Sequence, residues 1–98
     1  MSITGAADED GGAPTKVGVA ISDVMTGMLG AVSVLASLLA RDRAGSPAAG
    51  LGQRIDVSLL ASTLSALVNQ AQNAFVSGVA PGRRGNAHPN IVPYETFE

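Results

Sequence analysis

Residues 24–40 contain no charged side chain, and a single carboxylate, Asp23, stands immediately before them. Apolar residues recur in this run at intervals of three and four, which predicts an amphipathic helix. Gly27 and Gly30 add small positions that permit another backbone to approach closely. We therefore expect a helix buried between layers of a protein. Its apolar stripe comprises Met28, Ala31, Val32, Leu35, Leu38 and Leu39.

The same run raises the question of a membrane. A spanning helix needs about 20 mostly apolar residues, and residues 24–40 fall short of that length and include Thr26, Ser33 and Ser37. The sequence therefore predicts no membrane segment. A short membrane or interaction protein built on this helix stays as an alternative, and solubility of the isolated chain without detergent would count against it.

The segment before the helix admits two interpretations of Asp23. In residues 16–21, Val17, Val19 and Ile21 alternate with smaller residues, which predicts a short strand. Ser22 and Asp23 are both favourable N-cap residues, so Asp23 lies where the strand turns into the helix. In one interpretation Asp23 caps the helix. In the other it is a carboxylate nucleophile at the rim of a cleft, next to free helix N–H groups.

Composition excludes several classes of function. A formal net charge of -2 gives no basic face for nucleic acid. Cysteine is absent, which excludes disulfides and thiol catalysis, and one histidine with scattered carboxylates gives no metal-ligand spacing. No signal or transit segment is visible, because the N-terminus lacks a basic region followed by an apolar one.

Three aromatic residues in 98 are few for a free-standing domain, since aromatic side chains supply much of the apolar area that a small domain buries. We therefore expect a fragment whose partner surfaces are missing. A small helical protein with a core of alanine and leucine is the alternative. The aromatic residues are Phe75, Tyr94 and Phe97.

The rest of the chain predicts an α/β arrangement. Residues 1–15 form a loop, and residues 53–57 form a strand. A helix capped by Ser58 or Asp56 follows and ends at Gly78. The order strand–helix–strand–helix indicates a layer with parallel strands, which this chain cannot complete alone. The apolar stripe of the second helix comprises Leu60, Leu64, Leu67, Val68, Ala71 and Phe75.

Four blocks of sequence carry a resemblance to a known family. They are residues 16–28, the helix at 25–43, the stretch Gly-Gln-Arg-Ile-Asp-Val-Ser-Leu-Leu at 52–60, and Pro-Gly-Arg-Arg-Gly-Asn-Ala-His-Pro-Asn-Ile-Val-Pro-Tyr at 81–94. In this order and spacing they resemble the class III CoA-transferases of the CaiB/BaiF type. The last block is most similar to the branch that moves CoA between succinate and dicarboxylates such as glutarate or citramalate. Residues 46–51 depart from the family as an insertion.

The resemblance implies a fold and a reaction. The fold is a Rossmann-like large α/β domain in an interlocked homodimer when full length. Residues 16–80 would belong to that domain, and residues 81–98 would be a linker and the truncated start of the next. Asp23 matches the nucleophile that carries CoA from an acyl-CoA, such as succinyl-CoA, to a carboxylic acid. No cofactor is permanently bound, because coenzyme A enters as the acyl-CoA substrate.

The last block also holds the candidate binding residues. Asn86, Ala87 and His88 lie where related enzymes place a glycine-rich loop over the reacting carbonyls, although few glycines are present here. His88 is either a general base or a structural residue in the turn before a proline. Arg83 and Arg84 either bind a substrate carboxylate or CoA phosphate, or end a solvated loop.

An α-methylacyl-CoA racemase of the same superfamily is the alternative enzyme, with the matching aspartate acting as a base. In either case we expect the isolated 98-residue chain to be inactive. We expect a cytoplasmic location, or the mitochondrial matrix in a eukaryote.

Overall fold

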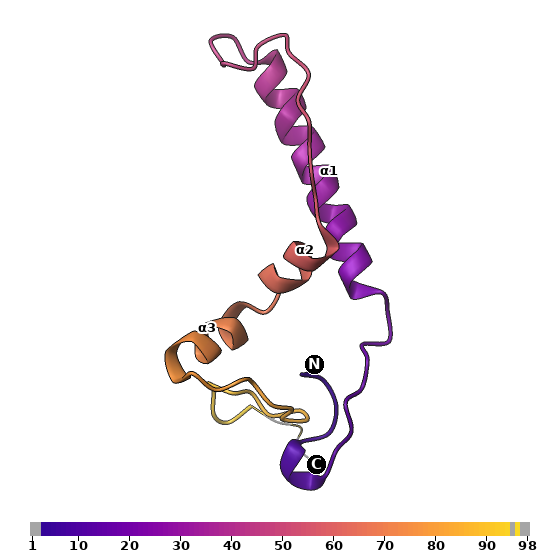
Figure 1. The fold of residues 1–98 in the computed structure, drawn as a ribbon, viewed down its shortest axis with the longest axis vertical. Helices are drawn as coiled ribbons and strands as arrows, with labels where there is room; N and C mark the ends of the chain where they lie inside the picture. Colours follow the sequence, from indigo (N-terminus) through magenta and orange to yellow (C-terminus); the bar gives the residue numbers. More distant parts are fainter. Residues whose placement is uncertain (1–2, 95, 97–98) are drawn as a thin grey trace. The chain divides into compact units, whose positions relative to one another are not determined.

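The computed structural model describes residues 3–94 and 96, and it is helical (Figure 1). A short 3-10 helix, Asp8–Asp10, precedes the three α-helices α1 (Ile21–Asp42), α2 (Leu59–Ser65) and α3 (Val68–Ser77). The chain forms two compact units. One is Ala20–Ala66, and the other combines residues 3–19 with the described part of 67–98.

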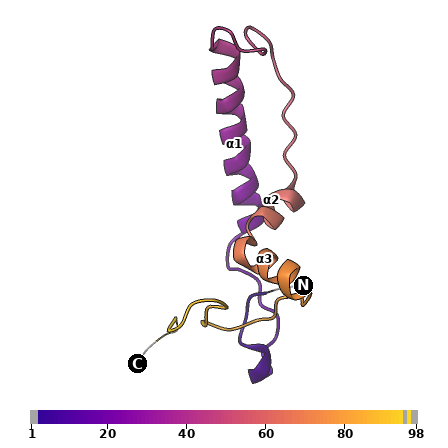
Figure 2. The ribbon, with the colours of Figure 1, turned by 90° about the vertical axis from the view of Figure 1, so that its left-hand side faces the viewer.

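The unit Ala20–Ala66 is built on α1. The chain turns back after α1, where the Gly50 N–H donates to the Arg41 carbonyl oxygen at 2.9 Å. The following residues, 51–58, run extended beside α1 in both views (Figures 1 and 2), and α2 then contacts α1. This arrangement brings the segment before α2 against the middle of α1.

The helix predicted from the uncharged run is confirmed, but the structure makes it longer. It spans 22 residues and contains an 18-residue window with a mean hydropathy of 1.7, so by length and composition α1 could cross a membrane. Residues 21–23 and 41–42 continue the helix beyond the uncharged run, so the prediction that it is too short to span a membrane is wrong. The absence of a membrane segment stays a prediction.

The predicted strands are not found among the described residues. Ile21 is the first residue of α1, and residues 53–57 are extended without being part of a ladder. A strand is defined by backbone hydrogen bonds to a neighbouring strand, and no such neighbour lies within residues 3–94 and 96. The α/β layer expected from this chain is thus not present in its described part.

The predicted second helix is two helices. Ser58 caps α2, since its Oγ accepts the Ala61 N–H at 3.2 Å, and the alternative cap Asp56 is wrong. Helix α3 starts at Val68, whose φ of 41° lies in the left-handed region that β-branched residues rarely adopt. A regular helix cannot continue through that conformation. The predicted end at Gly78 is confirmed, with a φ of 70°.

None of the apolar side chains that the structure describes is buried. Leu35 and Leu39 of the α1 stripe are 66% and 71% exposed, and Phe75 of α3 is 83% exposed. The predicted apolar stripes lie on helices, but the layers expected to cover them do not come from the described residues. These residues therefore gain little of the apolar burial that stabilises a folded domain.

We expect the isolated 98-residue polypeptide to unfold without a cooperative transition, because little apolar burial offsets the entropy of ordering its backbone. Differential scanning calorimetry with circular dichroism measures this. A two-state domain of about 100 residues absorbs about 60–80 kcal/mol on unfolding. A single transition of that size would contradict the prediction.

A second prediction concerns the C-terminal end of α1. Arg41 donates from Nε to Asp42 Oδ1 at 2.8 Å and from Nη2 to Oδ2 at 3.3 Å, and this hydrogen bonding lowers the pKa of Asp42 below its usual 3.8. A carboxyl group whose pKa is lower in the folded state stabilises the fold at pH values above its unfolded-state pKa. That contribution disappears as the pH falls through the lowered pKa. We expect an NMR titration to place Asp42 below 3.8, and Arg41→Gln to raise it. No change in Asp42 upon Arg41→Gln would contradict the assignment.

Candidate functional site

Asp23 is the third residue of α1, in its first turn, and its side chain is exposed. Its carboxylate makes no hydrogen bond or ion pair with any residue in the part of the chain that the structure describes. The N-cap position is held by Ala20, without a side-chain hydrogen bond, so the N-cap interpretation of Asp23 is wrong. The carboxylate is therefore free to act on another molecule.

The surroundings of Asp23 on its own helix are uncharged. Thr26 Oγ1 donates to the Ser22 carbonyl oxygen at 2.7 Å, so this hydroxyl is engaged within the helix. The first N–H groups of α1 have no intrahelical acceptor, and the helix dipole favours a negative charge in this turn. The position at the start of the helix and the uncharged surroundings together suit an unpaired carboxylate.

The two glycines of α1 make no close contact here. Apart from the chain neighbours and the nearby backbone of α1 itself, no described atom lies within 4 Å of the position that a Cβ would take at Gly27 or Gly30. The close approach of another backbone, expected from these glycines, is thus not made by the described residues.

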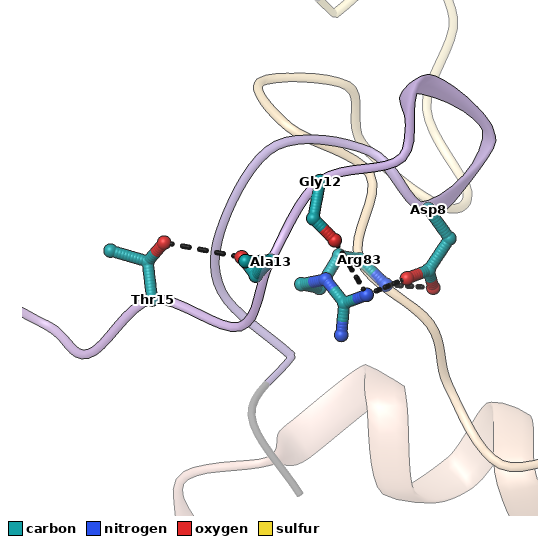
Figure 3. Close-up of polar contacts among 5 residues, drawn as sticks. All are labelled: Asp8, Gly12, Ala13, Thr15 and Arg83. Atoms are coloured by element: carbon teal, nitrogen blue, oxygen red, sulfur yellow. Dashed lines mark hydrogen bonds and ion pairs between the residues drawn. The ribbon is translucent and has the colours of Figure 1, made fainter.

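Arg83 belongs to the other unit and is held by the N-terminal segment (Figure 3). Its guanidinium forms an ion pair with Asp8, and its Nη2 also donates to the Gly12 carbonyl oxygen at 2.9 Å. The Arg83 side chain is 14% exposed, and its buried Nε has no hydrogen-bond partner among the described atoms. Arg83 is therefore engaged within the protein and does not offer its guanidinium to a ligand in this conformation.

The residues that follow Arg83 face solvent. The Ala87 N–H donates to the Arg84 carbonyl oxygen at 3.0 Å, which closes a turn in which Gly85 has a φ of 58°. The side chains of Arg84 and Asn86 are exposed and have no partner within residues 3–94 and 96. A hollow of about 320 Å³ opens beside the turn. It is lined by Asp8, Glu9, Gly82, Arg83, Arg84 and Ala87.

His88 is half-buried and engaged at three points. Its Nδ1 accepts the Asn90 N–H at 3.1 Å, and its backbone N–H donates to the Tyr94 carbonyl oxygen at 3.3 Å. Its ring lies 5.0 Å from the Tyr94 ring at an interplanar angle of 57°. Because Nδ1 accepts a hydrogen bond, the neutral ring carries its proton on Nε2. This arrangement favours the structural interpretation of His88.

The sequence analysis missed a cluster of three asparagines. Asn90 Oδ1 accepts from Asn69 Nδ2 at 3.2 Å and from Asn73 Nδ2 at 3.0 Å, and Asn90 Nδ2 donates to Asn73 Oδ1 at 3.2 Å. Asn69 and Asn73 are four residues apart, so they share one face of α3. That spacing was the available signal, although nothing in the sequence identified Asn90 as the partner.

The described residues contain no group of three or more histidine, cysteine, aspartate or glutamate side chains that could hold a metal ion. The described residues thus offer two separate candidate features, which are an unpartnered carboxylate on α1 and, within the other unit, an exposed turn with an unpartnered guanidinium and amide.

Comparison with known proteins decides the family. The family model described as CoA-transferase family III matches residues 1–98. The chain belongs to this family.

Curated relatives of this family III chain are named CoA-transferases. The chain is 45% identical to a succinate–glutarate CoA-transferase of Agrobacterium fabrum, covering 97% of this chain and 22% of that protein. It is 38% identical to a succinyl-CoA:mesaconate CoA-transferase of Haloarcula hispanica, and 34% identical to a human succinyl-CoA:glutarate CoA-transferase. Both of these matches cover 100% of this chain, with 23% of the first protein and 20% of the second.

A solved structure gives the same result for the fold. The crystal structure of a CaiB/BaiF family protein from Brucella suis matches this family III chain with a TM-score of 0.80 and 41% identity, over 100% of this chain and 24% of that one. The resemblance predicted from sequence is thus confirmed. The chain spans less than a quarter of the length of these relatives.

We expect His88→Asn to keep any enzymatic activity of the full-length protein within about tenfold of wild type, because an amide oxygen can accept the Asn90 N–H in place of Nδ1. Removal of a general base costs about 10²–10⁴-fold. Steady-state rates of the wild-type and His88→Asn proteins, measured over a range of pH, test this prediction. His88→Ala, which removes the acceptor, is the matched comparison and should lower stability by about 1 kcal/mol. Loss of about 100-fold or more in His88→Asn would instead identify a base.

Proposed function

We propose that the protein carrying this chain transfers coenzyme A from an acyl-CoA of the succinyl type to a carboxylic acid, with Asp23 as the nucleophile. The observation that carries the proposal is the Asp23 carboxylate in the first turn of α1, which has no partner among the described residues of this family III chain. The names of the relatives, which include succinate, glutarate and mesaconate, support a dicarboxylic acid as acceptor.

The reaction proceeds through three enzyme-bound intermediates, which are two mixed anhydrides and one thioester. The Asp23 carboxylate attacks the thioester carbonyl of the donor, and CoA thiolate leaves to give a mixed aspartyl–acyl anhydride. The thiolate attacks the aspartyl carbonyl, which releases the donor acid and leaves an aspartyl-CoA thioester. The acceptor carboxylate then attacks this thioester, which expels CoA thiolate and forms a second mixed anhydride. The thiolate finally attacks the acceptor carbonyl of that anhydride. Acyl-CoA is released and the Asp23 carboxylate is regenerated.

The features of α1 fit these steps. The N–H groups of its first turn can stabilise the negative charge that develops on a carbonyl oxygen near Asp23. The uncharged residues 24–40 bring no competing charge and help to exclude water, which would hydrolyse the anhydride and the thioester. A carboxylate is suitable because its anhydride and thioester retain the energy of the donor thioester.

The exposed turn supplies binding groups. The free Arg84 guanidinium matches the geometry of a substrate carboxylate or a CoA phosphate, and Asn86 can donate a hydrogen bond to a carbonyl oxygen. Ala87 lines the hollow beside Arg84. Arg83 and His88 support this turn from within.

The remaining proposals concern the full-length protein. We place residues 16–80 in a Rossmann-like α/β domain of an interlocked homodimer, and residues 81–98 in the linker to the next domain. The exposed apolar faces of the helices support this, because they need covering surfaces that the described residues do not provide. The isolated chain would be inactive, and the full-length protein would be cytoplasmic, or mitochondrial in a eukaryote.

Replacement of Asp23 tests the function. We expect Asp23→Asn to lower kcat for CoA transfer in the full-length protein by at least about 10⁴-fold, as the loss of a nucleophile does. Asp56→Asn is the matched control, because Asp56 is an exposed aspartate whose carboxylate pairs with Arg54. We expect it to retain wild-type kcat.

Two outcomes would overturn the proposal. One is an Asp23→Asn protein that transfers CoA at the wild-type rate. The other is uptake of solvent deuterium at a substrate carbon, which would show that Asp23 abstracts a proton instead of attacking a carbonyl.

A further inference from the structure

The loop from Arg83 to Asn90 is fixed at both ends, and its residues 84–87 are exposed. Asp8 and Gly12 hold the first end, and the asparagines of α3 hold the second. In the proposed function Arg84 and Asn86 bind substrate, but Asp8 and Asn90, which hold the ends of the loop, have no role.

The first anchor joins residues 75 positions apart in sequence. The Asp8 N–H donates to the Arg83 carbonyl oxygen at 3.2 Å, and Asp8 Oδ2 accepts the Arg83 backbone N–H at 2.9 Å. The ion pair between the two side chains completes the contact. A Cβ at Gly82 would overlap Asp8 Oδ2, so a larger residue at that position would have to displace the Asp8 carboxylate.

The anchor also separates the roles of two neighbouring arginines. Arg83 is 14% exposed and engaged with Asp8 and Gly12, whereas Arg84 is exposed and unpartnered among the described residues. Because Asp8 neutralises Arg83, the positive charge that remains at this turn is that of Arg84. Glu9 lines the same hollow and opposes an anion there, so the placement of Arg84 matters for binding.

The second anchor consists of three amide hydrogen bonds. Asn69 and Asn73, on one face of α3, donate to Asn90 Oδ1, and Asn90 Nδ2 donates back to Asn73. The Asn90 backbone N–H meanwhile donates to His88 Nδ1 at 3.1 Å. The end of the loop is thus held at Asn90, whose side chain binds to α3 and whose backbone N–H binds to the His88 ring.

We propose that Asp8 and Asn90 are positioning residues that hold Arg84 and Asn86 in place for the anionic carboxylic acid of the transfer reaction. This inference rests on the proposed function. Neither residue touches the reacting atoms in this account. They act by limiting the conformations of the turn between the two anchors, because an unheld loop must be ordered when the acid binds.

The test measures steady-state kinetics of the full-length protein with a dicarboxylic acid such as glutarate as acceptor. We expect Asp8→Ala and Asn90→Ala each to raise KM for that acid by about 10–100-fold, the scale of a misplaced binding group, with a smaller change in kcat. Asp8→Asn should give an intermediate KM, because its amide oxygen still accepts the Arg83 backbone N–H. It also serves as the milder variant if Asp8→Ala does not fold.

Matched controls come from the same elements. Asp10→Asn alters another carboxylate of the Asp8–Asp10 helix, and Gln72→Ala removes an exposed amide of α3; neither side chain has a partner among the described residues. Both variants should keep the wild-type KM.

A double-mutant cycle separates positioning from general stability. If Asp8 acts by placing Arg84, Asp8→Ala adds little to the raised KM of Arg84→Gln, because coupled residues are not additive. Additive effects, or folded Asp8 and Asn90 variants with wild-type KM, would overturn the inference. In either case, an Asp23→Asn protein that is inactive leaves the proposed function intact, whereas a fully active one removes it.

Discussion

The apolar faces of the helices are the constraint on which the rest of the structure depends. An apolar stripe at helical spacing normally packs against another part of a protein. Here Leu39 of α1 is 71% exposed and Phe75 of α3 is 83% exposed. The chain spans less than a quarter of its family III relatives. Under the proposed function, surfaces outside the described residues cover these faces and fix α1, together with the carboxylate in its first turn.

Two parts of the chain contribute chemistry of different kinds. The unit Ala20–Ala66 contributes Asp23, a carboxylate left free by its own helix, because Ala20 holds the N-cap position and the residues that follow carry no charge. The other unit contributes a turn whose ends are held and whose exposed groups are free. In this account covalent chemistry belongs to the first unit, and recognition of the anionic acid belongs to the second.

Sequence patterns correctly predicted the features that depend on neighbouring residues in the chain, which are a helix and two helix caps. The uncharged run identified α1, and the caps Ser58 and Gly78 were recognised because cap residues act on their immediate neighbours. The strands at 16–21 and 53–57 were wrong for the described residues, because a strand depends on a partner that local pattern does not supply. The break at Val68 escaped prediction because apolar periodicity continues through it while the backbone does not. The contact between Asp8 and Arg83 spans 75 positions and left no local signal.

The central claim is that Asp23 becomes covalently acylated, and mass spectrometry tests it most directly. The full-length protein is incubated with succinyl-CoA, treated with hydroxylamine and digested, and the peptide containing Asp23 is then analysed. The account predicts a hydroxamate at Asp23 that forms only when acyl-CoA is present, because hydroxylamine captures the anhydride or the thioester. An unmodified Asp23 peptide in a protein that is actively transferring CoA would contradict it.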